Sequence, residues 1–106
     1  TLVGRSVANG YCSIIYAIKR DFKKASFYLK RAEDDADRLG SPLEKGLLRR
    51  TQAELCYSFK SELKNMLPEP LDWYCNECIK LLKPIPGSYE INDALQYMNS
   101  IDNSQQ

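Results

Sequence analysis

The chain has 106 residues, of which 15 are basic and 14 acidic, and it contains no histidine. This length allows one domain that can bury its own core. The balanced charge argues against a general nucleic-acid or membrane-surface role. No apolar run is long enough to cross a bilayer, no signal-peptide pattern opens the chain, and a first residue of threonine suggests a piece of a longer protein.

Apolar periodicity predicts an all-α fold, an antiparallel array or bundle of about five helices. The first predicted helix covers residues 2–19. Gly4 and Gly10 weaken it by about 1 kcal/mol each relative to alanine. Its predicted inward face consists of Val7, Tyr11, Ile14, Ile15 and Ile18.

The central predicted helix, residues 21–39, organises the rest of the chain. Asp21 is its expected N-cap. Its apolar face recurs at helical spacing through Phe22, Ala25, Leu29, Ala32, Ala36 and Leu39. Because alanine lets a neighbouring helix approach closely, we expect helices packed on both flanks.

A helix C-terminal signal followed directly by a helix N-terminal signal joins this predicted helix to the next. Gly40 can take the left-handed conformation that ends a helix. Ser41, Pro42 and Glu44 form an N-cap, a first-turn proline and a capping box, which predicts an antiparallel hairpin. This pairing should also bring together the charges at the two helix ends, namely Asp34, Asp35 and Asp37 with Lys45, Arg49 and Arg50.

The remaining helices are separated by proline-containing linkers. The third is predicted over residues 42–66 and is ended by Pro68 and Pro70. The fourth covers residues 70–83, and a weaker last helix begins at a Ser88 cap. We expect one domain over residues 1–101 and a disordered tail over 102–106.

The first two predicted helices resemble a tetratricopeptide unit. Tyr16, Phe22, Ala25, Leu29 and Ala32 stand at that family's aromatic, aromatic, small, large and small positions. The sequence departs from the pattern at Cys12, Ser13 and Arg20, where the family has leucine, glycine and a turn glycine, and it lacks the closing proline. The likeness covers about residues 9–39, and it implies a nested helical pair.

A second resemblance competes with the first. Residues 28–33, Tyr-Leu-Lys-Arg-Ala-Glu, are similar to the third helix of microtubule-interacting-and-transport domains, which are three-helix modules. Both families are scaffolds that bind proteins or peptides without catalysis. The shared implication is a binding domain rather than an enzyme.

Few residues point to chemistry. Histidine, the commonest general base and metal ligand, is absent. The densest carboxylates, Glu33, Asp34, Asp35 and Asp37, lie beside basic residues on a predicted solvated face, which favours salt bridges over catalysis. We therefore predict a non-enzymatic domain without a cofactor.

The cysteines allow two interpretations. Cys75 and Cys78 are spaced like half of a zinc site, which Cys12 and Cys56 would complete. Both also fall on the apolar face of the fourth predicted helix, where isolated cysteines are common core residues. We favour reduced core residues of an intracellular protein, cytoplasmic or nuclear, and no metal.

Two groups of residues are candidates for partner binding. One is a basic cluster at the first inter-helix turn, which would dock an acidic peptide or a phosphate: Lys19, Arg20, Lys23 and Lys24. The other is aromatic: Tyr11, Tyr57 and Trp73. The leading hypothesis is an adaptor that binds a helix or linear motif of another protein in a groove along helices one and three. The alternative is a subunit-assembly domain that self-associates.

Overall fold

The protein is all-α. The computed structural model describes residues 4–87, 91–92, 94–96 and 99. Its helices are α1 (Arg5–Ile18), α2 (Phe22–Leu39), α3 (Pro42–Phe59) and α4 (Leu71–Leu82), and residues 91–92 and 94–96 are helical too. The described part of the chain has no strand, which confirms the predicted fold class. The predicted tail, residues 102–106, and much of the predicted last helix lie outside the described residues.

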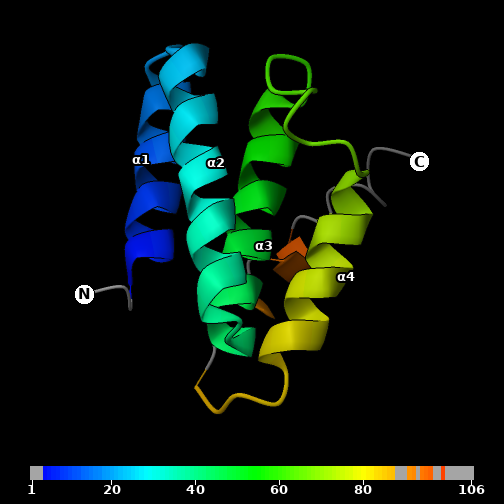
Figure 1. The fold of residues 1–106 in the computed structure, drawn as a ribbon. Helices are drawn as coiled ribbons and strands as arrows, with labels where there is room; N and C mark the ends of the chain where they lie inside the picture. Colours follow the sequence, from blue (N-terminus) through cyan, green and yellow to red (C-terminus); the bar gives the residue numbers. More distant parts are fainter. Residues whose placement is uncertain (1–3, 88–90, 93, 97–98, 100–106) are drawn as a thin grey trace.

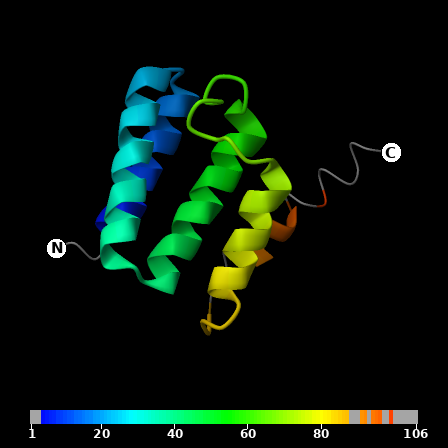
Figure 2. The ribbon, with the colours of Figure 1, turned by 45° about the vertical axis from the view of Figure 1, so that its right-hand side comes forward.

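The helices form an antiparallel array of two hairpins. α1 packs mainly on α2, and α4 packs mainly on α3. α3 also contacts both α1 and α2, so it joins the two hairpins from the middle of the array (Figures 1 and 2). The central element in space is therefore α3, whereas the sequence pattern pointed to residues 21–39.

The predicted caps at Asp21, Gly40 and Ser41 form, and the predicted Ser88 cap lies outside the described residues. The Asp21 side chain accepts a hydrogen bond from the Lys24 amide at 3.2 Å, and the Ser41 hydroxyl accepts one from the Glu44 amide at 3.4 Å. Gly40 ends α2 in the left-handed conformation, with a φ of 66°. The Glu44 carboxylate is buried, and its Oε2 has no hydrogen-bond partner among the described residues. Only the serine half of the predicted capping box is therefore present.

The α1–α2 contact is made by small side chains rather than by the predicted apolar face. The residues of α1 that are buried are Ser6, Gly10, Ser13, Ile14 and Ala17. Ser6 Oγ donates to the Ala32 carbonyl at 2.8 Å, and Ser13 Oγ donates to the Ala25 carbonyl at 2.7 Å. These bonds bring the serine hydroxyls directly onto the α2 backbone, a close approach that alanines on α2 permit.

The predicted inward face of the first helix is therefore wrong at most of its positions. Of those residues only Ile14 is buried, and Val7 is half-buried. Tyr11, Ile15 and Ile18 are exposed because the small residues at 6, 10, 13 and 17 occupy the buried side of α1, where Ser6 and Ser13 meet α2 and Gly10 meets Thr51 of α3. On α1 these large apolar residues do not point inward, because small residues form the contact with the neighbouring helices.

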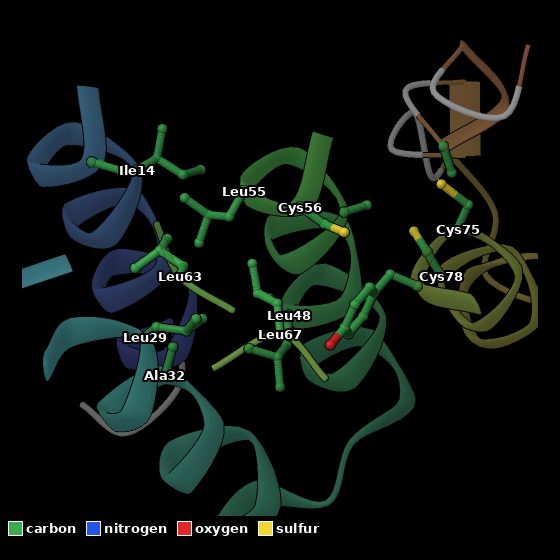
Figure 3. Packing of buried hydrophobic residues seen from close by; sticks show 14 of the residues in the cluster. Ile14, Leu29, Ala32, Leu48, Leu55, Cys56, Leu63, Leu67, Cys75 and Cys78 are labelled. Carbon is green, nitrogen blue, oxygen red and sulfur yellow. The ribbon is translucent and has the colours of Figure 1, made fainter. Parts of the chain in front are cut away.

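The core lies on both sides of α3. Figure 3 shows Ile14, Leu29, Leu55 and Leu63 gathered on the side of α1 and α2. On the other side Cys56 faces Cys75 and Cys78 of α4. Gly46 permits close contact there, since a Cβ at this position would stand 2.5 Å from Leu82 Cγ.

The third helix is shorter than predicted. It ends at Phe59, and turns follow over residues 60–66 instead of a continuous helix to residue 66. Lys60 folds the linker back, because its ammonium donates to the carbonyls of Leu67 at 2.8 Å and Glu69 at 2.5 Å. Leu63 and Leu67 stay buried, so the helical spacing of apolar residues persists beyond the helix.

Asp34 and Asp35 form no ion pair with the basic residues of α3 that the sequence paired with them, although Asp37 and Arg49 line the same groove. Asp34 pairs within its own helix with Lys30, at 3.1 Å. Asp35 turns toward α1, where it accepts a hydrogen bond from Asn9 at 2.9 Å and lies 3.9 Å from Arg5. These two carboxylates therefore find their partners one helical turn away and on α1.

Candidate functional site

The most prominent exposed apolar feature lies on α1. Tyr11, Ile15 and Ile18, here named the α1 stripe, are 53%, 51% and 66% exposed. Their spacing of four and three residues places them on one face of the helix. They are exposed because the small residues of α1 take the face toward α2. The structure thus turns large apolar side chains outward at the edge of the array.

The neighbouring helix α3 adds a second exposed aromatic residue. Tyr57 is 53% exposed. α1 and α3 lie side by side, and a Cβ at Gly10 would stand 3.1 Å from Thr51 Oγ1. Each of the two helices of the predicted binding groove therefore carries one exposed tyrosine from the candidate set.

A concave groove lies elsewhere, between α2 and α4. Its volume is about 500 Å³, and α3 and the α3–α4 linker complete its walls. α1 contributes no residue to it. The lining residues are Lys30, Glu33, Asp37, Leu48, Arg49, Gln52, Asn65, Met66, Pro68, Glu69, Trp73 and Tyr74. Trp73 is therefore separated from the other two predicted aromatic residues.

A hydrogen-bonded chain of polar side chains lines this groove. The Arg49 guanidinium stacks on the Trp73 ring, 4.9 Å from its centroid, and Arg49 Nη1 donates to Gln52 Oε1 at 2.8 Å. Gln52 Nε2 donates to Glu33 Oε1 at 3.3 Å. Burial raises the pKa of Glu33 above its usual value. These side chains bond one another, and only Arg49 Nε among the described atoms of this hydrogen-bonded chain of side chains is buried without a hydrogen-bond partner.

The predicted basic cluster divides into partnered and unpartnered side chains. Arg20 Nη2 lies 3.2 Å from Glu62 Oε2, and Lys24 Nζ lies 4.0 Å from Asp21. Lys19 and Lys23 are exposed, and neither forms an ion pair with a residue that the structure describes. Only part of the cluster is therefore available to an anionic partner.

Arg20 also has an unusual backbone conformation. Its φ is 64°, in the left-handed region that favours glycine. The Arg20 amide donates to the Ala17 carbonyl and the Asp21 amide donates to the Tyr16 carbonyl, which closes the end of α1. Arg20 thus closes the turn after α1 in a backbone conformation that glycine adopts more readily.

The cysteine residues of α4 belong to the core. Cys75 and Cys78 are fully buried, and Cys56 is buried beside them. Burial raises the pKa of the Cys75 thiol to about 11. In the part of the chain that the structure describes, no three side chains of the metal-ligating kinds converge. The interpretation of Cys75 and Cys78 as core residues is confirmed, whereas Cys12 is only half-buried.

The residues that sequence reasoning missed are Ile15 and Ile18, which it assigned to the core. A signal for their exposure was present in the small residues at positions 6, 10, 13 and 17, which repeat at helical spacing. Residues 25–36 contain alanines at helical spacing. Two helices that each carry small residues at such spacing are expected to pack closely against each other. The same logic that predicted nesting from Ala25 and Ala32 applies to their partners on α1.

Comparison of the chain with family models, curated proteins and solved structures found no match. None of the helices in the described ranges has both the length and the apolar character that spanning a membrane requires. The candidate site therefore rests on its own geometry.

Proposed function

We propose that the domain is a non-catalytic protein–protein interaction module, which binds a helix or short linear motif of a partner protein through the α1 stripe. The observation that carries this proposal is the exposure of Tyr11, Ile15 and Ile18 along one helix face. Single exposed apolar residues are normal on protein surfaces. Three in register on one helix are the pattern of anchors that helix-in-groove recognition uses.

The physical argument is the hydrophobic effect. Burying an isoleucine or tyrosine side chain against a partner gains roughly 1.5–3 kcal/mol before the costs of association. The stripe offers three such side chains, and Tyr57 on α3 adds an amphipathic ring of the type enriched at binding hot spots. A partner helix lying along α1 would bury the three residues of the stripe together.

We also propose that the first hairpin is tetratricopeptide-like. Ala25 and Ala32 nest against α1, as the small positions of that family would. α3 touches both helices of the first hairpin, which supports a stacked array. Helical arrays of this type present an extended binding surface.

The experiment that tests the function compares two glutamate substitutions. The chain is immobilised, and proteins are captured from extract by the wild type, by Ile15→Glu and by Phe27→Glu. Phe27 is the matched control, since it is also 53% exposed but lies on α2, outside the stripe. Proteins that the wild type and Phe27→Glu retain should be lost from Ile15→Glu. Identical capture by all three chains would contradict the proposal.

The alternative function is assembly with a copy of itself or with another subunit. The exposed Phe27 favours it, because it gives the domain a second exposed apolar side chain, on α2 and outside the stripe. Sedimentation over a wide concentration range separates the two functions. A module that binds a partner should stay monomeric when alone, and an assembly domain should associate as concentration rises.

A further inference from the structure

We propose that the partner of the α1 stripe is an amphipathic helix with apolar residues at i, i+4 and i+7 and acidic residues beyond the end that meets Lys19. This inference rests on the proposed function and names the chemistry of its partner. The apolar spacing follows from that of Tyr11, Ile15 and Ile18. The acidic end follows from the charges around them.

Lys19 stands at the C-terminal end of the stripe. It stands four residues after Ile15 and directly follows Ile18, so it lies next to the apolar side chains on the same side of the helix. Lys19 is exposed and makes no ion pair with any described residue. An acidic group on a partner helix that covers Ile15 and Ile18 would therefore come within reach of the Lys19 ammonium.

The surroundings of Lys19 leave its charge uncompensated. The carboxylates close to it in the turn and the linker, Asp21 and Glu62, are each held by another cation. Asp21 caps α2 and lies 4.0 Å from Lys24, and Glu62 lies 3.2 Å from Arg20. The C-terminal end of α1 has only a partial negative charge from its carbonyl groups. The net field at this end of the stripe is positive and favours an anionic partner.

The composition of α1 sharpens this conclusion. Its sequence from Arg5 to Ile18 contains no aspartate or glutamate, and basic residues stand at both of its ends: Arg5, Lys19 and Arg20. No carboxylate on the helix itself would repel an acidic partner. Complementary charge at the rim of an apolar contact chiefly sets orientation and association rate. The acidic end would thus fix the direction in which the partner helix lies.

The same charges disfavour a second copy of this chain as the occupant. In a two-fold dimer that packs α1 on α1, each side contributes the same surface. A parallel arrangement would set Lys19 against Lys19 of the copy. An antiparallel one would offer Lys19 no carboxylate from the facing α1, because α1 has none. Asp35 of α2, which lies beside the opposite end of α1, is already bonded to Asn9 and lies 3.9 Å from Arg5 of its own chain. Self-association through the stripe would therefore offer Lys19 no carboxylate that lacks a partner at that end of α1.

The test uses two synthetic helical peptides with identical leucines at i, i+4 and i+7. One has glutamates beyond each end of the leucine stretch, and the other has lysines there. Binding to the intact chain is followed by fluorescence anisotropy at low and at moderate salt. We expect the glutamate peptide to bind about threefold to tenfold more tightly at low salt, with the difference shrinking as salt is added.

Charge reversal provides the decisive comparison. Lys19→Glu should abolish or invert the preference for the glutamate peptide, whereas Lys80→Glu, on the exposed surface of α4, should leave it intact. Ile15→Glu should weaken both peptides. An equal affinity for the two peptides would overturn the acidic partner and leave the proposed function standing.

Three further outcomes would also overturn the inference. If neither peptide binds, the partner is not a helix of this kind, and the capture experiment with Ile15→Glu decides the proposed function independently. If the chain forms a dimer that Ile15→Glu dissociates, the occupant is a second copy. A preference for the lysine peptide would likewise contradict the charge argument.

Discussion

The hydroxyl of Ser13 donates a 2.7 Å hydrogen bond to the carbonyl oxygen of Ala25 on the neighbouring helix. Both residues are fully buried. This pair, with the Ser6–Ala32 pair two turns earlier on α1, holds α1 against α2 by contact with backbone rather than by interlocking large side chains.

Removing the Ser13 hydroxyl should destabilise the domain. The Ala25 carbonyl keeps its hydrogen bond within α2. Ser13→Ala therefore loses one intramolecular hydrogen bond and leaves no buried polar atom without a partner. The expected cost is about 1 kcal/mol. Urea denaturation measures it, with Ser58→Ala on the exposed surface of α3 as the control. Equal stability of the two variants would show that the hydroxyl bond contributes nothing.

Enlarging Ala25 should disrupt the same contact. Ala25 is fully buried against α1, and leucine there would add three carbons to a close-packed seam. Overpacking of this kind costs about 1–3 kcal/mol. The control is Ser26→Leu, one position further along α2, where the side chain is half-buried. Thermal melts should show a clearly larger loss for Ala25→Leu, and a neutral result would contradict the nesting.

Gly46 offers a test of the α3–α4 contact. Alanine at a helix interior normally stabilises relative to glycine by about 1 kcal/mol. Here the added Cβ would stand 2.4 Å from Leu82 Cδ2, and Leu82 is fully buried. We therefore expect Gly46→Ala to destabilise the domain. Combining it with Leu82→Ala should cost less than the sum of the two changes, because the truncated side chain makes room.

Glu33 should give the stability a distinctive pH dependence. Burial raises its pKa in the folded state, so the folded chain holds this proton at pH values where the unfolded chain has released it. Its contribution to stability therefore decreases as pH rises from the unfolded pKa through the folded pKa. Glu33→Gln removes this term and keeps an acceptor for Gln52. The free energy of unfolding of the variant minus that of the wild type should be larger at pH 7 than at pH 4. Chemical denaturation of both chains at the two pH values measures this difference.

Alkylation should distinguish the cysteines. The thiolate is the reactive form, and burial raises the pKa of Cys75 to about 11. Iodoacetamide at neutral pH should modify the half-buried Cys12 first, and should reach Cys56, Cys75 and Cys78 only on unfolding. Mass spectrometry over time reads this order. Rapid modification of Cys75 in the folded chain would contradict its place in the core.

Local sequence signals predicted α2 and its hairpin with α3 well. Asp21, Gly40 and Ser41 act through neighbours within four residues, so their roles can be read without knowing the fold. The all-α class followed for the same reason, since helical periodicity is itself local.

The parts that could not be predicted depend on tertiary contact. Which face of α1 points inward was decided by the alanines of α2, which accept small partners and leave Ile15 and Ile18 outside. The end of α3 at Phe59 depends on Lys60 reaching carbonyls seven and nine residues further along the chain. The groove beside Trp73 is formed by α2, α3, α4 and a linker, so it cannot be predicted from any single stretch of sequence.

The small-residue contact also sets how firmly α1 is held. Its buried apolar side chains are only Ile14 and Ala17, so detaching α1 exposes less apolar surface than detaching any interior helix would. Local opening of α1 therefore sacrifices less burial of its own apolar side chains than opening α3 would. A helix seated on Tyr11, Ile15 and Ile18 would bind only the closed form, and by linkage it would suppress that opening. Binding of a partner to the α1 stripe and the closed position of α1 are therefore thermodynamically linked, so that each favours the other.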